Sequence, residues 1–129
     1  MNPGNGHLNG QLVVDANACP VQLEALPPEE ILTGAPQAGI AELGTLGGAE
    51  YGLWEMSVGT ATDVEADEVF VVTAGEGTVL IAPFGGAPAR TLHLIPGSIV
   101  RLHAGMHTTW TVTSALRKVW FAPHTPEMA

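Results

Sequence analysis

The residues best suited to chemistry are one carboxylate and two histidines in the second half of the chain. Glu68 opens an apolar run, and His103 and His107 lie at and beyond the end of a later one. If the first run is a strand, period-two alternation places Glu68 on the same face as Phe70. A carboxylate on the inward face of an apolar barrel has the surroundings of a general base or a ligand anchor. We therefore predict Glu68 and His107 as the catalytic candidates.

The same carboxylate and both histidines could instead form part of a metal site. Imidazole and carboxylate are ordinary ligands of divalent metals such as manganese, zinc, iron and nickel. The sequence leaves two alternatives open: Glu68, His103 and His107 hold such a metal, or no cofactor is present. The single cysteine, Cys19, excludes an intrachain disulfide and a multi-cysteine metal site.

Four further side chains are predicted to line a ligand pocket: Glu55, Phe70, Trp110 and Lys118. Aromatic walls with a few polar groups are typical of small-molecule pockets. Lys118 is the only lysine, and it could hold a carboxylate substrate. Alternatively, it forms a cross-strand ion pair with Glu55.

Asp63, Glu65 and Asp67 alternate along the chain just before Glu68. Period two puts all three on one face, and like charges so close together favour exposure to solvent. A calcium site is the alternative, but the glycine and the ligand spacing of a calcium loop are missing. We expect this acidic segment to be solvated.

These residues need strands to position them, and the chain supplies many short ones. Apolar runs alternate with Gly and Pro, and no amphipathic helix longer than two turns is evident. Strands are predicted at 11–14, 39–43, 51–58, 68–74, 77–82, 90–94, 98–103, 108–114 and 117–121, with a hairpin turn at 75–77, a helical turn at 27–32 and a polar loop or extended lead-in at 59–67. So many strands in one small chain favour closure into a barrel, which removes exposed edges.

Length and charge fit one domain that avoids anionic partners. We predict a flexible tail at 1–10, an N-terminal arm with the first strands at 11–50, a barrel core at 51–123 and a tail at 124–129. Thirteen acidic residues against four basic ones give a net charge of −9, which disfavours nucleic acids and anionic membranes. The N-terminus has neither the basic region nor the apolar core of a secretory signal, so we expect a cytoplasmic protein.

An ordered set of short motifs resembles the cupin superfamily. The motifs are Gly52-Leu53-Trp54-Glu55, Glu68-x6-Gly75, Pro96-Gly97-Ser98, His103-Ala104-Gly105, Trp110 and Arg117-Lys118. They are similar to those of small single-domain cupins such as ethanolamine-utilisation protein Q and the C-terminal part of (S)-ureidoglycine aminohydrolase. The resemblance spans about residues 30–121. It implies an all-β double-stranded β-helix, or jelly-roll barrel, with an N-terminal wrapping arm, and it suggests a homodimer.

The chain departs from this family at the metal ligands. Many cupins hold a divalent metal with a His-x-His pair, a glutamate and a later histidine. Glu68 occupies the glutamate position. The other positions hold no histidine: Thr62 and Val64, or Ala61 and Asp63, in the first motif and Thr108 in the second. The resemblance therefore implies the barrel without the usual three-His, one-Glu site.

Three functions follow as hypotheses. The first is a cupin that binds a small molecule at the barrel mouth, near Glu68, His107, Trp110 and Lys118, without a tightly held metal. The second is a metal-dependent enzyme acting on a small nitrogen-containing or carboxylate metabolite, as the likeness to ureidoglycine aminohydrolase implies. The third is a regulatory or structural dimer module, because a fold does not fix a function.

Overall fold

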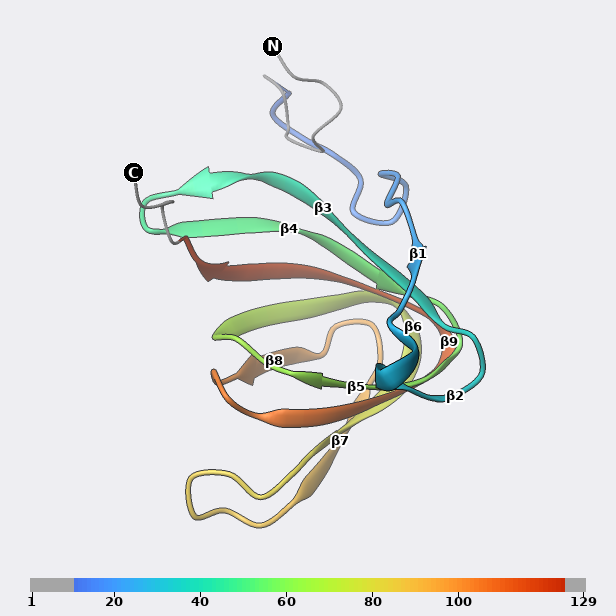
Figure 1. Cartoon of the computed structure of the whole chain (residues 1–129). Helices are drawn as coiled ribbons and strands as arrows, with labels where there is room; N and C mark the ends of the chain where they lie inside the picture. Colours follow the sequence, from blue (N-terminus) through green and yellow to red (C-terminus); the bar gives the residue numbers. More distant parts are fainter. Residues whose placement is uncertain (1–10, 125–129) are drawn as a thin grey trace.

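The computed structural model describes residues 11–124, and nearly all of its regular structure is β-strand (Figure 1). The elements are β1 (Glu24–Ala25), the 3-10 turn η2 (Pro28–Glu30), β2 (Ile31–Thr33), β3 (Gln37–Leu46), β4 (Ala49–Met56), β5 (Gly59–Val64), β6 (Glu68–Ile81), β7 (Arg90–Leu94), β8 (Ile99–Leu102) and β9 (His107–Pro123). All strand pairs are antiparallel, and the sheet curls on itself. The predicted all-β jelly-roll barrel is confirmed.

The predicted tails lie outside the described residues, apart from His124. Within residues 11–124, no helix is long and apolar enough to cross a membrane. The predicted helical turn at 27–32 is the short η2, and it leads directly into β2.

β9 joins three other strands of the barrel. Its 17 residues pair with β5 near their start and with β4 near their end, and they pair with β6 along most of their length. Because side chains alternate along a strand, one face of β9 looks into the barrel, with an interruption at the exposed residues 113–115. The buried residues on that face are Thr108, Trp110, Val112, Leu116, Lys118 and Trp120.

The predicted hairpin across Gly75 is wrong, because β6 runs unbroken through it. Gly75 instead marks a bend where β6 crosses β9, and the pairing register shifts around it. Its φ is +86°, and a Cβ atom there would lie 2.0 Å from the carbonyl oxygen of Ala115. Glycine is needed because the chain must bend and touch a second backbone at the same point. β9 likewise replaces the two strands predicted at 108–114 and 117–121.

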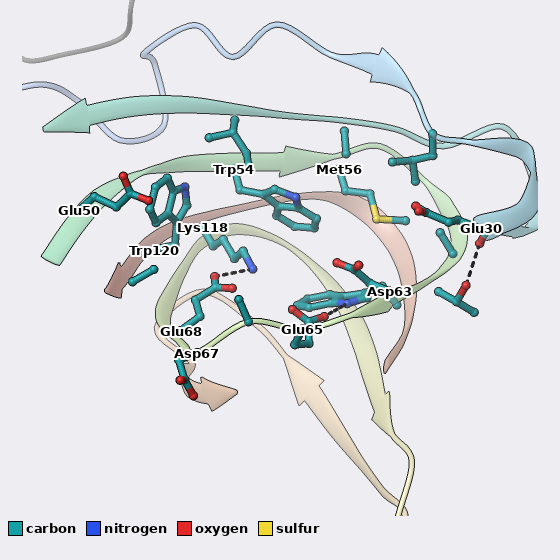
Figure 2. A pocket seen from close by; sticks show the side chains of 18 residues that line it. Glu30, Glu50, Trp54, Met56, Asp63, Glu65, Asp67, Glu68, Lys118 and Trp120 are labelled. Carbon is teal, nitrogen blue, oxygen red and sulfur yellow. Dashed lines mark hydrogen bonds and ion pairs between the residues drawn. The ribbon is translucent and has the colours of Figure 1, made fainter. Parts of the chain in front are cut away.

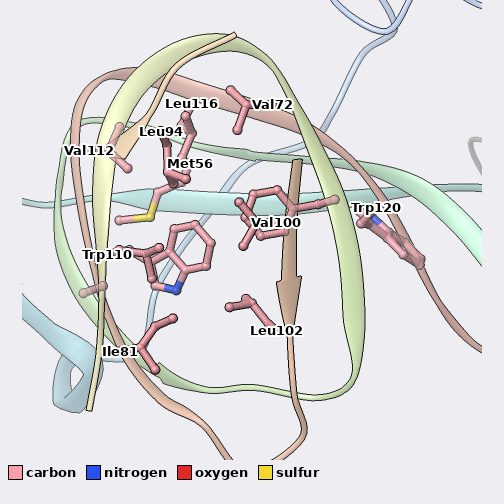
Figure 3. Packing of buried hydrophobic residues seen from close by; sticks show 13 residues of the cluster. Met56, Val72, Ile81, Leu94, Val100, Leu102, Trp110, Val112, Leu116 and Trp120 are labelled. Atoms are coloured by element: carbon pink, nitrogen blue, oxygen red, sulfur yellow. The ribbon is translucent and has the colours of Figure 1, made fainter. Parts of the chain in front are cut away.

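The main core fills the barrel between the two halves of the sheet (Figure 3). Phe70 and Val72 are 0% and 1% exposed, which confirms the predicted inward face of this strand. They pack with Leu102, Leu116 and Trp110.

A second apolar cluster holds the N-terminal arm against the outer face of the sheet. Val14, Ala16, Cys19 and Val21 of the arm pack on buried Ala41, Leu43 and Leu53. The predicted wrapping arm is therefore present, but the strand predicted at 11–14 is wrong. The edge of β3 is already paired with β1, and Leu12 and Val13 are 99% and 78% exposed.

Candidate functional site

A cavity of about 300 Å³ opens at the barrel mouth (Figure 2). Indole rings, carboxylates and one ammonium group lie around it, and the lining comes from β3, β4, β5, β6 and β9, from the loop between β5 and β6, and from the segment before β2. The lining residues are Leu26, Glu30, Ala38, Ile40, Glu50, Trp54, Met56, Ala61, Thr62, Asp63, Glu65, Ala66, Asp67, Glu68, Trp110, Lys118, Trp120 and Ala122. Of the residues predicted to surround a pocket, Glu68, Trp110 and Lys118 line this cavity, and its walls are aromatic and acidic.

Lys118 reaches the cavity from the interior face of β9, and its side chain is 5% exposed. Its Nζ lies 2.8 Å from Oε2 of Glu68. The same nitrogen lies 4.6, 4.1 and 4.8 Å from the ring centroids of Trp54, Phe70 and Trp110. Aromatic faces attract cations, so one carboxylate and three rings compensate for the hydration that the ammonium has lost.

Glu65 is the most deeply placed carboxylate of the cavity, with 9% of the residue exposed. The Thr108 hydroxyl donates to its Oε2 at 2.6 Å, and the Trp110 indole N–H donates to the same oxygen at 3.1 Å. Burial raises the pKa of Glu65 above its ordinary value, although these two hydrogen bonds oppose the shift. Thr108, which stands at the later histidine position of cupins, thus holds a carboxylate in place.

The other two acids of the predicted solvated segment differ from Glu65. Asp63 is exposed at the rim of the cavity. Asp67 accepts hydrogen bonds from the Ala104 backbone N–H at 3.1 Å and from Arg101 at 3.3 Å, and these contacts lower its pKa. All three acids line the cavity, so the predicted shared face is correct, but the predicted exposure to solvent is wrong for Glu65. Glu65 follows β5 directly, and its backbone hydrogen bonds with Gly105 and Met106 continue the pairing there and hold its side chain toward the barrel.

The alternative of a Glu55–Lys118 ion pair is wrong. In the register of β4 and β9, Glu55 lies opposite Arg117, and Lys118 lies opposite Trp54. Arg117 and Glu55 therefore pair outside the barrel at 2.7 Å, while Lys118 points inward to Glu68. Glu55, a predicted ligand contact, does not line the cavity.

Arg117 also fastens the N-terminal arm. Its guanidinium donates to the carbonyl oxygens of Ala16 at 2.9 Å and Cys19 at 2.6 Å. With Glu55 neutralising its charge, Arg117 ties the arm to the outer face of β4 and β9.

The structure does not bring His103 or His107 to Glu68. The His103 ring stacks on Phe84 with centroids 6.5 Å apart, and His107 is exposed beside a different hollow lined by Val64 and Leu80. Among residues 11–124, no three His, Cys, Asp or Glu side chains are grouped to hold a metal ion.

The charges at the cavity also argue against a metal site of the cupin type. The carboxylate at the expected ligand position, Glu68, already bonds an ammonium group, whose positive charge would repel a metal ion. The residues present therefore do not fit the usual cupin metal site.

Sequence reasoning gave no functional role to three residues of this cavity. Glu65 was assigned to a solvated segment, although its alternation with the apolar Ala61 is a signal for the inward face. Trp54 and Trp120 are not among the pocket residues predicted from the sequence, and both line the cavity. A Cβ atom on Gly52 would lie 2.7 Å from the Trp120 ring, so the glycine of the Gly-x-Trp motif makes room for the later tryptophan.

Phe70, a predicted ligand contact, does not line the cavity. It is fully buried, and its ring contributes to the site by facing the Lys118 ammonium rather than by touching the open space.

The fold resembles that of solved cupins. A EutQ protein from Clostridium difficile matches with a TM-score of 0.58 and 18% identity over 80% of each chain. A putative ethanolamine utilization protein Q from Salmonella typhimurium matches with a TM-score of 0.56 and 14% identity, over 81% of this chain and 97% of that one. An oxalate oxidase in complex with the substrate analogue glycolate matches with a TM-score of 0.54 and 18% identity, over 70% of this chain and 53% of that one.

These identities are low, so the structural matches establish the fold alone. A comparison with curated proteins gives no match. Residues 43–120 match the family described as the EutQ-like cupin domain, and this span covers more than half of the chain, including most of the residues that line the cavity. The chain therefore belongs to the family of EutQ-like cupin domains.

Proposed function

We propose that this cupin binds a small organic molecule in the cavity at the barrel mouth and does so without a tightly held metal ion. The observation that carries the proposal is the Lys118–Glu68 pair inside an aromatic cavity of about 300 Å³. Three indole rings provide apolar contact area, and a few fixed polar groups provide orientation. A protein cation pairs with the carboxylate that would otherwise be the metal ligand.

The test compares the wild-type protein with a variant whose cavity is blocked. Ala66 is exposed and lines the cavity, so Ala66→Trp adds a large side chain at the mouth with little disturbance of the core. Ala87→Trp, in the exposed loop after Phe84, is the matched control. A library of small metabolites is screened by thermal shift and by the indole N–H signals in NMR. Ligands of the wild-type protein should bind the Ala87→Trp variant equally well and the Ala66→Trp variant at least about tenfold more weakly.

The proposed absence of a tightly held metal ion is tested separately. Elemental analysis of protein purified without chelator should find far less than one manganese, zinc, iron or nickel ion per chain. Near-stoichiometric metal that disappears in Glu68→Ala would overturn this part and favour the metal-dependent alternative.

The homodimer also stays a prediction. Residues 11–14 form no strand that could pair with a partner, so the expectation rests on the resemblance to other cupins. Light scattering coupled to size exclusion would decide it.

A further inference from the structure

The contacts around the cavity indicate which chemical class of ligand it selects. We propose that the cavity selects a small organic cation with N–H donors, such as a primary ammonium or an amidinium group. Glu65 would accept its hydrogen bond, and the faces of Trp54 and Trp110 would form its walls. This inference rests on the proposed binding function and specifies the ligand.

The first observation is the free acceptor on Glu65. Thr108 and Trp110 both donate to Oε2, so this oxygen is fixed in position. Among the described residues, Oε1 has no hydrogen-bond partner, although the residue is only 9% exposed. Figure 2 shows this second oxygen on the side of Glu65 that faces Glu68 and Lys118, across the open middle of the cavity. This oxygen is not among the fully buried polar atoms, so it is open to the cavity, where a ligand can donate a hydrogen bond to it.

The second observation is the charge of the lining. Six carboxylates, those of Glu30, Glu50, Asp63, Glu65, Asp67 and Glu68, line the cavity together with one ammonium group. Lys118 neutralises Glu68, and Arg101 lies beside Asp67. Within residues 11–124, neither Glu30 nor Asp63 has an ion-pair partner. The remaining field at the mouth is negative, so it attracts cations and repels carboxylates.

The third observation is that two aromatic rings of the cavity already face a cation. Trp54 and Trp110 face a cation, Nζ of Lys118, at 4.6 and 4.8 Å. Their centroids lie 5.4 Å apart, so the two rings form one continuous aromatic surface along the cavity. The electron-rich faces of indole rings favour a positive ligand over a neutral one of equal size.

The positive charge of Lys118 does not reverse the preference of the cavity for cations. Its ammonium is bonded to Glu68 and covered by three rings, and only 5% of the side chain is exposed. A carboxylate ligand would have to separate this pair and then lie beside Glu65 and Glu68. This argues against the carboxylate substrate that the sequence suggested for Lys118.

The experiment uses four probes of similar shape: benzylammonium, benzyl alcohol, benzoate and benzyltrimethylammonium, which is a cation without N–H donors. The protein contains three tryptophans, and all three line the cavity, so their indole N–H signals in a ¹⁵N NMR titration report binding directly. Benzylammonium should shift the Trp110 signal and bind at least about tenfold more tightly than benzyl alcohol and benzyltrimethylammonium. Benzoate should bind more weakly than benzyl alcohol and benzyltrimethylammonium.

Two variants locate the contact. Glu65→Gln keeps an acceptor for Trp110 but removes the charge, and it should weaken benzylammonium about tenfold while leaving benzyl alcohol unchanged. Asp63→Asn removes the charge of an exposed rim residue and keeps an oxygen for the Val64 backbone N–H, and it should weaken benzylammonium about threefold. Glu29→Gln, which lowers the net negative charge equally but lies outside the cavity, should have no effect.

The outcomes separate the two proposals. If benzoate binds more tightly than benzylammonium, or if Glu65→Gln and Asp63→Asn both leave benzylammonium unchanged, the cation inference is wrong and the binding function stands. If neither these probes nor the metabolite library shift any indole signal, the binding function itself fails.

Discussion

Nζ of Lys118 and Oε2 of Glu68 lie 2.8 Å apart, with side chains that are only 5% and 16% exposed. The pair joins the interior face of β9 to the first residue of β6. Removing one member of an enclosed ion pair leaves the other charge without compensation, and this costs more than the pair contributes.

We therefore expect strong coupling between these two residues. Glu68→Gln and Lys118→Met should each lower the free energy of unfolding in urea, and the double variant should lose about 1–3 kcal/mol less than the sum of the two. The exposed pair of Arg101 and Asp67, at 3.3 Å, is the control. A double-mutant cycle on this control pair, with Arg101→Gln and Asp67→Asn, should give a coupling free energy below about 1 kcal/mol. Equal coupling in both cycles would mean that enclosure of the Lys118 pair has no energetic effect.

Glu65 should make stability depend on pH. Its pKa is raised above 4.5 in the folded protein. At pH values just above 4.5, the folded state therefore binds more protons at this site than the unfolded state does, and stability falls as the pH rises through that interval. Glu65→Gln stays neutral and avoids this loss. Its Tm should exceed that of the wild-type protein by roughly 2–5 °C at pH 7, and the difference should shrink at pH 4. A difference that is constant from pH 4 to pH 7 would contradict the raised pKa, and Glu29→Gln controls for net charge.

Arg117 should control access to the only cysteine. Because its guanidinium bonds the carbonyl oxygens of Ala16 and Cys19, Arg117→Gln should loosen the arm locally. Alkylation of Cys19 by iodoacetamide under native conditions should then become about tenfold faster. Arg101→Gln removes the same charge on another strand and should leave the rate unchanged. Similar rates in all three proteins would show that apolar contacts alone hold the arm.

Alanine substitutions at Gly75 and Gly86 should distinguish the cost of backbone strain from the cost of a steric clash. Both have positive φ, +86° and +82°, but a Cβ atom on Gly75 would lie 2.0 Å from Ala115 while one on Gly86 meets nothing within 4 Å. Gly86→Ala should lower the free energy of unfolding by about 1–2 kcal/mol, the cost of a left-handed alanine. Gly75→Ala should cost more than about 3 kcal/mol, because β6 and β9 must also move apart. Equal losses in urea denaturation would mean that the crossing tolerates a methyl group.

The sequence predicted the barrel because strands carry local signals. The alternation that places Phe70 and Val72 inside, and the turn at Pro96-Gly97, depend only on neighbouring residues. The hairpin predicted at Gly75 is wrong because a glycine in a hairpin and a glycine at a strand crossing look the same locally. Only the position of Ala115, forty residues later, distinguishes them.

The cavity was predicted less completely because its chemistry depends on register between distant strands. Glu68 and Lys118 were both identified, but pairing Lys118 with Glu55 required β4 and β9 to be offset by one residue from the register they adopt. The environment of Glu65 depends on Thr108 and Trp110, which lie more than forty residues away. No local pattern contains that contact.

The length of β9 has a consequence for assembly. β4, β5 and β6 all use it as a partner, so each of them keeps an open edge until residues 107–123 arrive. The earlier strands cannot close the barrel among themselves, and the contacts that complete it span most of the chain. Folding should therefore be slow for a protein of this size and should pass through a state with unpaired strands, in which one molecule can capture the edge of another. Cleavage between β8 and β9 would leave an incomplete barrel, which a synthetic peptide of β9 could be expected to restore.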